Sequence, residues 1–219
     1  MKNILCYGDS NTWGFIPGKF NYETMTARRY PKTVRWTGLL QKLLGENYFI
    51  YEEGLNARTT NLDYSDLAGL NGKTYLLPCL YSHAPLDLVI IMLGCNDLKN
   101  CFHNSSAQEI SLAIGELCEL IQSKNYGPDL ECPPQILIIG HPILAHERGF
   151  DNSKMFENGV ARSKEFDKYF SLIAKKYGCH YFNAAPHIEL SDIDGIHFDE
   201  KSHKIFAEFM EIEIKKIFG

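Results

Sequence analysis

Short, mostly apolar runs recur along the chain. Leu88–Leu93 is the longest, and similar runs lie at 4–7, 48–51, 136–139 and 181–184. A strand with one solvated face alternates apolar and polar residues, whereas a strand that is apolar throughout is covered on both faces. The runs therefore predict buried strands of a parallel sheet.

Apolar residues between these runs recur at steps of three and four, which is typical of amphipathic helices. This spacing predicts helices over 34–44, 75–81, 106–121, 156–177 and 205–217. Strands that alternate with helices predict one α/β domain over residues 1–219. We expect a flavodoxin-like, doubly wound, five-stranded parallel sheet with helices on both faces.

Two segments, 57–74 and 141–155, show neither pattern and are predicted to be long loops. Long loops in a compact domain often carry function. In a doubly wound sheet the ligand crevice lies beyond the carboxyl ends of the strands. Chemistry is therefore expected where the predicted strands end.

Composition excludes several classes of protein. The 219 residues carry 22 Lys and Arg against 27 Asp and Glu, which gives a net charge of -5. A mildly acidic chain lacks the basic surface that binds nucleic acid or anionic membranes. No apolar run approaches the roughly 20 residues of a membrane span, and no signal peptide is recognisable. We expect a cytoplasmic protein.

The chain has seven cysteines, an odd number that cannot pair completely within one molecule. They form no CxxC pair and no cluster with zinc-finger spacing. Free thiols in a reducing compartment are the prediction. No bound metal is expected.

The first predicted strand ends in the sequence Gly8-Asp9-Ser10. A serine at this point begins a helix, where free backbone N–H groups stabilise developing negative charge. An N-capping serine fits the same position. This motif alone leaves both a nucleophile and a helix cap open.

Two further polar clusters follow later strands. Asn96 and Asp97 come after the run 88–93, where the Asn96 amide could donate to an oxyanion, although a turn with a capping Asp97 is the alternative. Near the C-terminus, Asp194 precedes His197 by three residues. A tight loop of that length brings the carboxylate to Nδ1–H and leaves Nε2 as a base, unless the histidine is an incidental surface residue.

The three sites together form a stronger signal than any one of them. A nucleophile, an oxyanion donor and an acid–base pair at one edge of a sheet predict acyl-transfer chemistry. The order Ser, Asp, His is that of α/β-hydrolases, but the nucleophile stands near residue 10 and the chain has no G-x-S-x-G elbow.

These motifs resemble the first, third and fifth blocks of the GDSL, or SGNH, hydrolases, and the similarity extends over nearly the whole chain. Further stretches resemble the bacterial arylesterase/acyltransferase subgroup: 34–38, 52–60, 70–72 and 87–94. The resemblance implies the SGNH hydrolase fold and ester hydrolysis. For this subgroup it also implies acyl transfer to alcohols or peroxide.

Residue by residue, the resemblance implies that Ser10 is the nucleophile, His197 the base and Asp194 its orienting acid. The implied oxyanion hole consists of the Ser10 N–H, the Ala57 N–H and the Asn96 side chain. Most members carry glycine where Ala57 aligns. A backbone N–H does not need glycine, provided that the local φ and ψ accept a Cβ atom.

Other residues near these motifs are weaker candidates. Trp13 and Phe15 follow the nucleophile and are expected to wall an acyl pocket, with ordinary packing as the alternative. Cys95 precedes Asn96 and is interpreted as a small pocket-lining residue. Arg58 is expected to pair with an acidic neighbour in a structural role. His141 is expected to lie in a turn, with a place at the rim of the crevice as the alternative.

The predicted activity is that of a serine esterase on short-chain acyl esters, with water or an alcohol as acceptor and no metal or organic cofactor. An acyl-CoA thioesterase and a carbohydrate O-deacetylase of the same fold are the alternatives. A flavodoxin-like binding module is disfavoured because a Gly-rich phosphate loop with a lysine is missing. The complete set of site residues argues against a non-catalytic interaction protein. The resemblance also implies a homo-oligomer, and the aromatic segment 13–22 is compatible with one.

Overall fold

Five parallel strands form the central sheet of the computed structural model, which describes residues 1–145 and 155–219. Their spatial order is β4-β1-β5-β6-β7, and every neighbouring pair runs in parallel. The strands are β1 (Lys2–Gly8), β4 (Tyr48–Gly54), β5 (Leu88–Met92), β6 (Gln135–Gly140) and β7 (His180–Asn183). The predicted doubly wound α/β fold is thereby confirmed.

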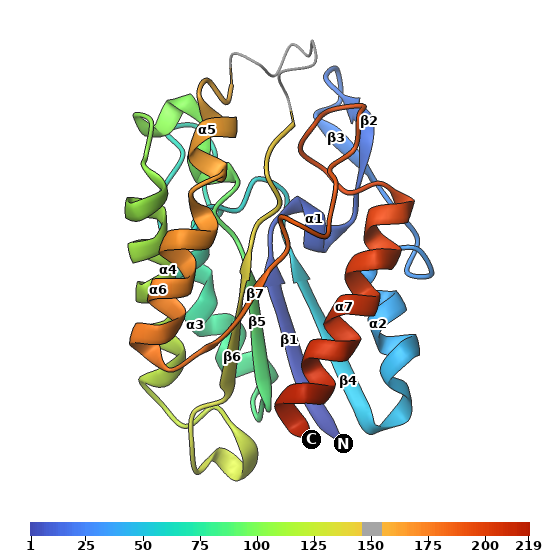
Figure 1. Cartoon of the computed structure of the whole chain (residues 1–219), viewed down its shortest axis with the longest axis vertical. Coiled ribbons are helices and arrows are strands. Elements are labelled where there is room, and N and C mark those ends of the chain that lie inside the picture. The colour runs from blue at the N-terminus through green and yellow to red at the C-terminus, as the bar shows by residue number, and fades with distance from the viewer. Residues whose placement is uncertain (146–154) are drawn as a thin grey trace.

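Helices cover both faces of this sheet, as the uniformly apolar strands require (Figure 1). On one side α2 (Trp36–Leu44) packs against α7 (Glu200–Phe218), which carries the C-terminus. On the other side α4 (Ala107–Gln122) packs between α3 (Gly72–His83) and α6 (Phe166–Tyr177). All five residues of β5 are buried, so the middle of the sheet is the centre of the core.

Side-chain caps set where several helices begin. Ser106 and Glu109 form a capping box at the start of α4, in which each side chain accepts a hydrogen bond from the backbone N–H of the other. Asn71 and Asp199 each accept a backbone N–H from the first turn of α3 and α7, respectively. These caps explain why α3 and α7 begin earlier than their apolar periodicity predicts.

The single helix predicted over 156–177 is wrong. The chain forms a short helix, α5 (Gly159–Ser163), before α6 begins. The Ser163 hydroxyl donates to the Val160 carbonyl and accepts from the Leu144 N–H. A serine that bonds the backbone in this way competes with the continuing helix, and the apolar periodicity gives no sign of that break.

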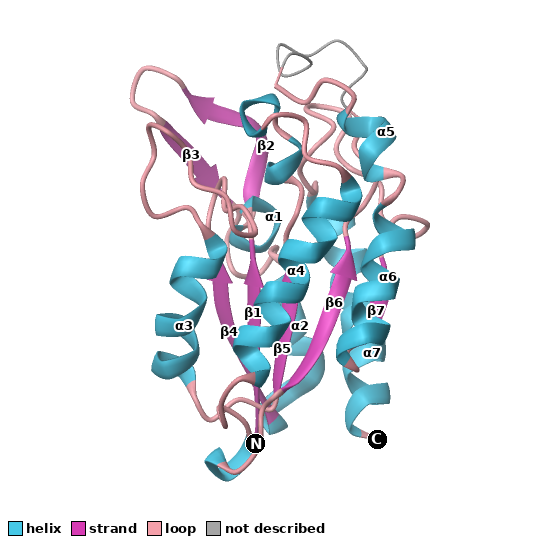
Figure 2. Cartoon of the chain, turned by 90° about the vertical axis from the view of Figure 1, so that its left-hand side faces the viewer, coloured by secondary structure: helices cyan, strands magenta, loops and turns pink. Residues whose placement is uncertain are grey.

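A β-hairpin that the sequence pattern did not predict follows the first turn of helix after β1. Its strands are β2 (Phe15–Asn21) and β3 (Thr26–Arg29), which pair antiparallel as a separate two-stranded sheet (Figure 2). Pro17 and Gly18 interrupt the strand signal, since both residues are rare inside strands. The predicted loop 57–74 is irregular up to the start of α3, whereas most of 141–155 lies outside the described residues.

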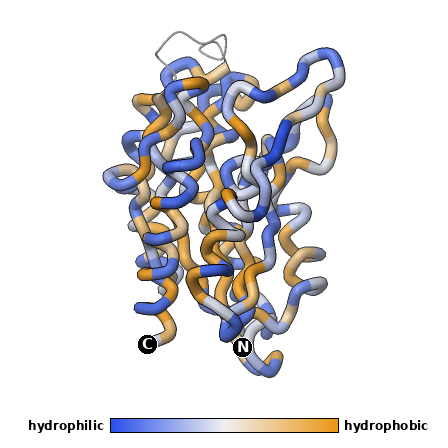
Figure 3. Tube along the Cα trace, turned by 90° about the vertical axis from the view of Figure 1, so that its right-hand side faces the viewer, coloured by the Kyte–Doolittle hydropathy of each residue, from blue (hydrophilic) through white to orange (hydrophobic). Residues whose placement is uncertain are grey.

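Hydrophobic positions are concentrated along the strands, and hydrophilic positions are more frequent in the loops above them (Figure 3). The buried apolar side chains of the described residues form one connected cluster that includes both faces of the sheet. In the part of the chain that the structure describes, no helix is long and apolar enough to cross a bilayer.

Candidate active site

The nucleophile candidate lies at the carboxyl end of β1. Helix α1 (Ser10–Trp13) begins there, and Asp9, rather than Ser10, caps it by accepting the Asn11 N–H at 3.0 Å. Ser10 is therefore not the N-cap of α1, and its hydroxyl makes no capping hydrogen bond to the helix. Ser10 is buried, with 7% of the residue exposed.

Glycine at the end of β4 allows α1 to pack closely against the sheet. A Cβ atom on Gly54 would lie 2.1 Å from the Trp13 backbone nitrogen and 2.5 Å from the Thr12 carbonyl carbon. Both neighbours are backbone atoms, which cannot rotate away as a side chain would. Gly54 therefore fixes the depth at which the helix that begins with Ser10 packs on the sheet.

His197 and Asp194 lie on one tight loop before α7. One Asp194 oxygen accepts the Ile196 and His197 N–H groups at 3.1 and 3.0 Å. The other oxygen lies 2.8 Å from His197 Nδ1. On the opposite side of the ring, Nε2 lies 2.9 Å from the Ser10 hydroxyl. Asp194, His197 and Ser10 thus form a continuous hydrogen-bonded row, although Ser10 and His197 are 187 residues apart in sequence.

The charge on Asp194 is stabilised locally. Burial by itself raises the pKa of this carboxyl. The hydrogen bond and charge of His197 and the two loop N–H groups lower it by more than burial raises it, so the net pKa is below the ordinary value. An ionised Asp194 accepts a hydrogen bond from Nδ1–H, so the ring proton stays on Nδ1. That assignment leaves the Nε2 lone pair facing Ser10.

Phe15 lies against the histidine ring. The two ring centroids are 4.0 Å apart and nearly parallel, with an interplanar angle of 17°. Trp13 is half-buried, and the Arg29 guanidinium lies over its ring at 5.2 Å. Phe15 therefore borders the row of site residues. Contact of Trp13 or Phe15 with a substrate stays a prediction.

The three predicted oxyanion donors are the Ser10 N–H, the Ala57 N–H and the Asn96 side chain. Within the described chain, neither the Ser10 N–H nor the Ala57 N–H donates to another protein group. Asn96 is buried beyond β5, and its side-chain amide donates to the Arg58 carbonyl at 3.1 Å. Since that amide carries two hydrogens, the contact orients it and leaves one donor unused.

Ala57 occupies a backbone conformation that favours glycine. Its φ is 62°, within a turn that the Arg58 N–H closes by donating to the Leu55 carbonyl at 3.1 Å. The Tyr64 hydroxyl donates to the Ala57 carbonyl at 3.0 Å and accepts from the Lys99 ammonium at 3.0 Å. These contacts hold the Ala57 peptide in place despite the strain of its Cβ atom.

The guanidinium of Arg58 bonds backbone carbonyls rather than the acidic side chain expected from the sequence as its partner. Its guanidinium donates to the carbonyls of Gly8 and Glu53, with the Gly8 contact at 3.0 Å. The charged group also lies over the Tyr7 ring at 4.2 Å. Arg58 therefore joins the ends of β1 and β4 under the site, and it is 2% exposed.

Asp97 does not cap the segment that follows it. It is fully buried, and its carboxylate accepts the Thr60 N–H at 3.0 Å and the Thr60 hydroxyl in a short contact. Burial raises the pKa of Asp97 to about 6, although the Thr60 hydrogen bonds oppose that rise. Asp97 thus ties the loop after β4 to the end of β5.

Three possible metal ligands lie together beneath the nucleophile. The ligand atoms of Asp9, Cys95 and His141 are all within 4.8 Å of one another. However, His141 Nδ1 donates to the Pro142 carbonyl at 2.9 Å, and its Nε2 faces the Asn11 amide nitrogen at 3.4 Å, so the lone pair already has a donor. Burial raises the pKa of the Cys95 thiol well above its ordinary value, which keeps the sulfur protonated. The set fits hydrogen-bonded packing better than a metal centre.

A second group with ligand atoms at similar separations lies between β4 and α3, where His83 Nε2 contacts the Glu53 carboxylate at 2.7 Å. This contact occupies Nε2 of His83, just as the Asn11 amide occupies Nε2 of His141. Cys79, the third member, has a pKa raised to about 12 by burial and by the charge of Glu53. Its thiol is therefore protonated as well.

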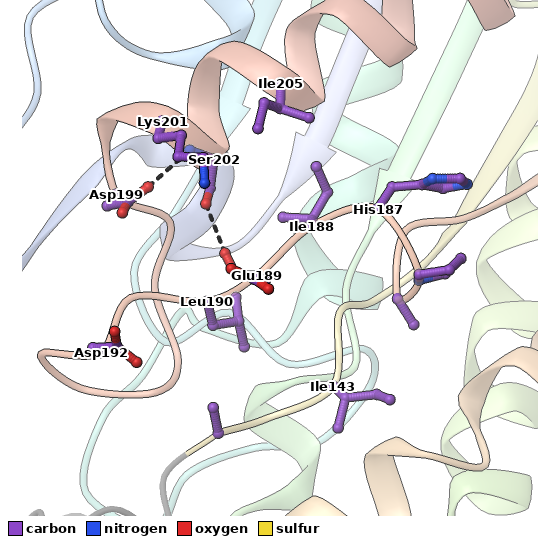
Figure 4. Close-up of a pocket in the computed structure, with 13 residues that line it drawn as sticks. Ile143, His187, Ile188, Glu189, Leu190, Asp192, Asp199, Lys201, Ser202 and Ile205 are labelled. Atoms are coloured by element: carbon purple, nitrogen blue, oxygen red, sulfur yellow. Dashed lines mark hydrogen bonds between the residues drawn. The ribbon is translucent and has the colours of Figure 1, made fainter.

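A pocket of 710 Å³ lies at the amino-terminal end of α7 (Figure 4). It is bordered by the segment 185–192 and by the first turn of α7, where Ser202 donates to the Glu189 carbonyl at 2.6 Å. None of the three residues in the hydrogen-bonded row lines it.

Sequence reasoning missed several residues that support the site. Asn11, Tyr64 and Lys99 attracted no attention because no motif spacing marks them. Asn11 bonds backbone groups 185 and 187 residues away. Lys99 bonds the Tyr64 hydroxyl, and Tyr64 bonds the Ala57 carbonyl. Such partners are visible only in the folded chain. Asn11 alone carried a signal, since it directly follows the Gly8-Asp9-Ser10 motif.

The model of the GDSL-like lipase/acylhydrolase family matches residues 6–205. The chain belongs to this family. As a GDSL-family protein it is a hydrolase that acts on ester bonds, which confirms the predicted class of enzyme. No curated protein matches the chain in sequence.

Solved structures place this GDSL hydrolase near two esterases. The aryl esterase of M. smegmatis is 35% identical, with a TM-score of 0.91 and 99% of each chain covered. A carbohydrate acetylesterase from Sinorhizobium meliloti is 37% identical, with a TM-score of 0.91 over 99% of this chain and 100% of the other. A lipolytic protein of the G-D-S-L family from Veillonella parvula, 14% identical with a TM-score of 0.66 and 98% of each chain covered, shares the fold.

Proposed function

We propose that this GDSL hydrolase is a serine esterase for short-chain acyl esters, with Ser10 as nucleophile, His197 as base and Asp194 as orienting acid. The observation that carries the proposal is the hydrogen-bonded row: 2.9 Å from the Ser10 hydroxyl to Nε2 and 2.8 Å from Nδ1 to Asp194. Both distances are within the range that general-base catalysis requires.

In the acylation step, His197 Nε2 takes the Ser10 proton as the hydroxyl oxygen attacks the ester carbonyl carbon. Asp194 stabilises the resulting imidazolium. The carbonyl oxygen becomes negative and accepts hydrogen bonds from the Ser10 and Ala57 N–H groups and from the Asn96 amide. His197 then protonates the leaving alcohol, and the acyl group stays on Ser10.

In the second step, water or an alcohol attacks the acyl-serine while His197 takes its proton. Water gives a carboxylic acid, and an alcohol gives a new ester. The proportion of the two products depends on which nucleophile reaches the acyl-serine beside His197.

Replacing the nucleophile tests the proposal most directly. Ser10→Ala is expected to lower kcat on an aryl acetate by about 10⁶-fold, because the acyl-enzyme cannot form. Ser123→Ala is a matched control, since Ser123 is exposed and bonds only the Leu120 carbonyl of its own helix. Full activity in the folded Ser10→Ala variant would contradict the assignment.

Carbohydrate O-acetyl esters are the second candidate substrate class. They are favoured by the S. meliloti carbohydrate acetylesterase, which is 37% identical over 99% of this chain. A panel of aryl acetates, acetylated sugars and acyl-CoA thioesters, compared by kcat/KM, separates esterase, deacetylase and thioesterase activities. Adding alcohol acceptors to the same assays measures the proportion of acyl transfer.

The chain is further proposed to form a homo-oligomer through its hairpin. Tyr22 and Met25, at the hairpin turn, are 74% and 68% exposed, and large exposed apolar side chains favour contacts between protein surfaces. Light scattering after size-exclusion chromatography tests this. A monomer at all concentrations would contradict it, and Tyr22→Ser with Met25→Ser is expected to weaken the assembly.

A further inference from the structure

The side chain of Asn11 contacts the backbone on both sides of His197. Its amide nitrogen donates to the Ile196 carbonyl at 3.1 Å, and its amide oxygen accepts the Phe198 N–H at 2.8 Å. Asn11 is 2% exposed, so these bonds do not compete with bulk water. One buried amide thus holds the two peptide groups that flank the proposed base.

The orientation of this amide is determined by its neighbours. A carbonyl oxygen must face the amide NH₂, and a backbone N–H must face the amide oxygen, so Asn11 has only one satisfactory orientation. The contacts of His141 support this orientation. Its Nδ1–H donates to the Pro142 carbonyl at 2.9 Å, so Nε2 is an acceptor and faces the Asn11 NH₂ at 3.4 Å. Burial lowers the pKa of His141, which favours this neutral form.

The loop that holds His197 needs such a contact. Asp194 and His197 orient each other within one loop, so their contact does not set the distance from the loop to Ser10. Ser10 belongs to α1, at the other end of the chain. Asn11 is the next residue in α1, and its two hydrogen bonds fix the position of the loop relative to the helix that carries the nucleophile.

Asparagine at this position departs from the name of the family. GDSL spells Gly-Asp-Ser-Leu, whereas this chain continues Gly8-Asp9-Ser10 with Asn11. A leucine side chain is similar in size but has neither a donor nor an acceptor. The paired contact to the histidine loop therefore requires a polar residue that the family name does not contain.

We propose that Asn11 is a positioning residue for ester hydrolysis, whose side-chain amide holds His197 at hydrogen-bonding distance from Ser10 and is itself oriented by His141. This inference rests on the proposed roles of Ser10 and His197. Asn11 acts through the backbone of the loop and touches no reacting atom.

The test compares Asn11→Leu and Asn11→Ala with the wild-type enzyme on an aryl acetate. Loss of both hydrogen bonds is expected to lower kcat by about 10- to 100-fold with little change in KM, because a displaced base slows proton transfer more than it weakens binding. Reaction of Ser10 with phenylmethylsulfonyl fluoride is expected to slow by the same factor, since it depends on the same base.

Asn21→Ala is the matched control. Asn21 is exposed in the hairpin, where its side chain also accepts two backbone N–H groups, and its replacement is expected to leave kcat unchanged. Values of kcat within about twofold of wild type in folded Asn11 variants would overturn the proposal. A change in melting temperature alone, with kcat retained, would reduce Asn11 to a structural role and overturn it as well.

The wild-type enzyme provides a measurement that does not depend on whether the variants fold. Hydrogen exchange of the Phe198 amide is expected to be strongly slowed, and exchange at the rate of a free peptide would overturn the proposal. Ser10→Ala separates the two levels of inference. If it is inactive while Asn11→Leu is fully active, only the role of Asn11 fails, whereas activity in Ser10→Ala removes the proposed nucleophile.

Discussion

His197 and His141 both follow elements that end at the site, and both lie near an aspartate, yet their surroundings differ. The side chain of His197 is 14% exposed and lies between Asp194 and Ser10. His141 is 1% exposed, and its two nitrogens face the Pro142 carbonyl and the Asn11 amide. The His197 ring faces a hydroxyl that it can deprotonate, whereas both nitrogens of His141 are used in hydrogen bonds to a carbonyl and an amide.

This difference shows that a nearby carboxylate does not by itself make a histidine a base. Asp194 contacts Nδ1 directly and accepts loop N–H groups as well, so its pKa falls below the ordinary value despite burial. Near His141, burial has the largest effect and lowers the pKa of the imidazole. Hydrogen bonding, more than proximity of charge, separates a proposed catalytic pair from a packed one.

The largest expected effect comes from exchanging the two histidines in turn for glutamine. His197→Gln is expected to lower kcat by about 10⁴-fold or more, because glutamine cannot accept the Ser10 proton. His141→Gln is expected to lower kcat by less than about tenfold, since it disturbs only the orientation of Asn11. Steady-state kinetics on an aryl acetate measures both. Equal losses would remove the distinction between the two rings.

Asp194→Asn tests the acid of the proposed catalytic pair. The amide retains the shape of the carboxylate but favours the wrong tautomer of His197, so kcat is expected to fall by about 10³- to 10⁴-fold with KM nearly constant. A rise in KM that accounts for the whole loss of kcat/KM would instead indicate a role in substrate binding.

Asp97 extends the comparison to a buried carboxylate that accepts hydrogen bonds from Thr60. Its folded-state pKa of about 6 lies above the ordinary 3.8, so the folded chain retains the proton to higher pH than the unfolded chain does. The unfolding free energy is therefore expected to fall as pH rises from about 4 to 6, by up to about 3 kcal/mol from this residue. Asp97→Asn is expected to remove that part of the dependence, as denaturant unfolding at several pH values would show. Parallel curves for the two proteins would contradict it.

The smallest expected effect is at Ala57. Ala57→Gly relieves the positive φ of 62° but increases the freedom of the unfolded chain, so the unfolding free energy is expected to change by less than about 1 kcal/mol. Because the N–H is retained, kcat is expected to fall far less than the about 10²- to 10³-fold that loss of an oxyanion donor costs. A large loss of kcat would show that the Cβ atom itself positions the donor.

Much of the fold could be predicted from local patterns. The run Leu88–Leu93 indicated a strand covered on both faces, and β5 is fully buried. The break between α5 and α6 could not be predicted, because it depends on Ser163 bonding Leu144 in a distant segment. The hairpin was missed for a local reason: Pro17 and Gly18 obscure its strand pattern.

The candidate site divides in the same way. Asp194 and His197 are three residues apart, so chain stiffness alone brings them together, and their spacing was informative. Ser10, Asn96 and Ala57 came from motifs and from a family resemblance. Asn11, Tyr64 and Asp97 bond groups from other elements, and no pattern within the sequence marks those partners.

The sequence by itself determined the order of strands and helices and the chemical groups at the strand ends, since apolar periodicity and short-range spacing are local properties of the chain. Tertiary structure alone decided that His141 is buried against Asn11 and that Asn11 bonds the backbone on both sides of His197. These contacts depend on the packing of α1, the His197 loop and the end of β6, three segments that meet only when the sheet has formed. Their distances are set by contacts across the fold, and such contacts have no fixed separation in sequence.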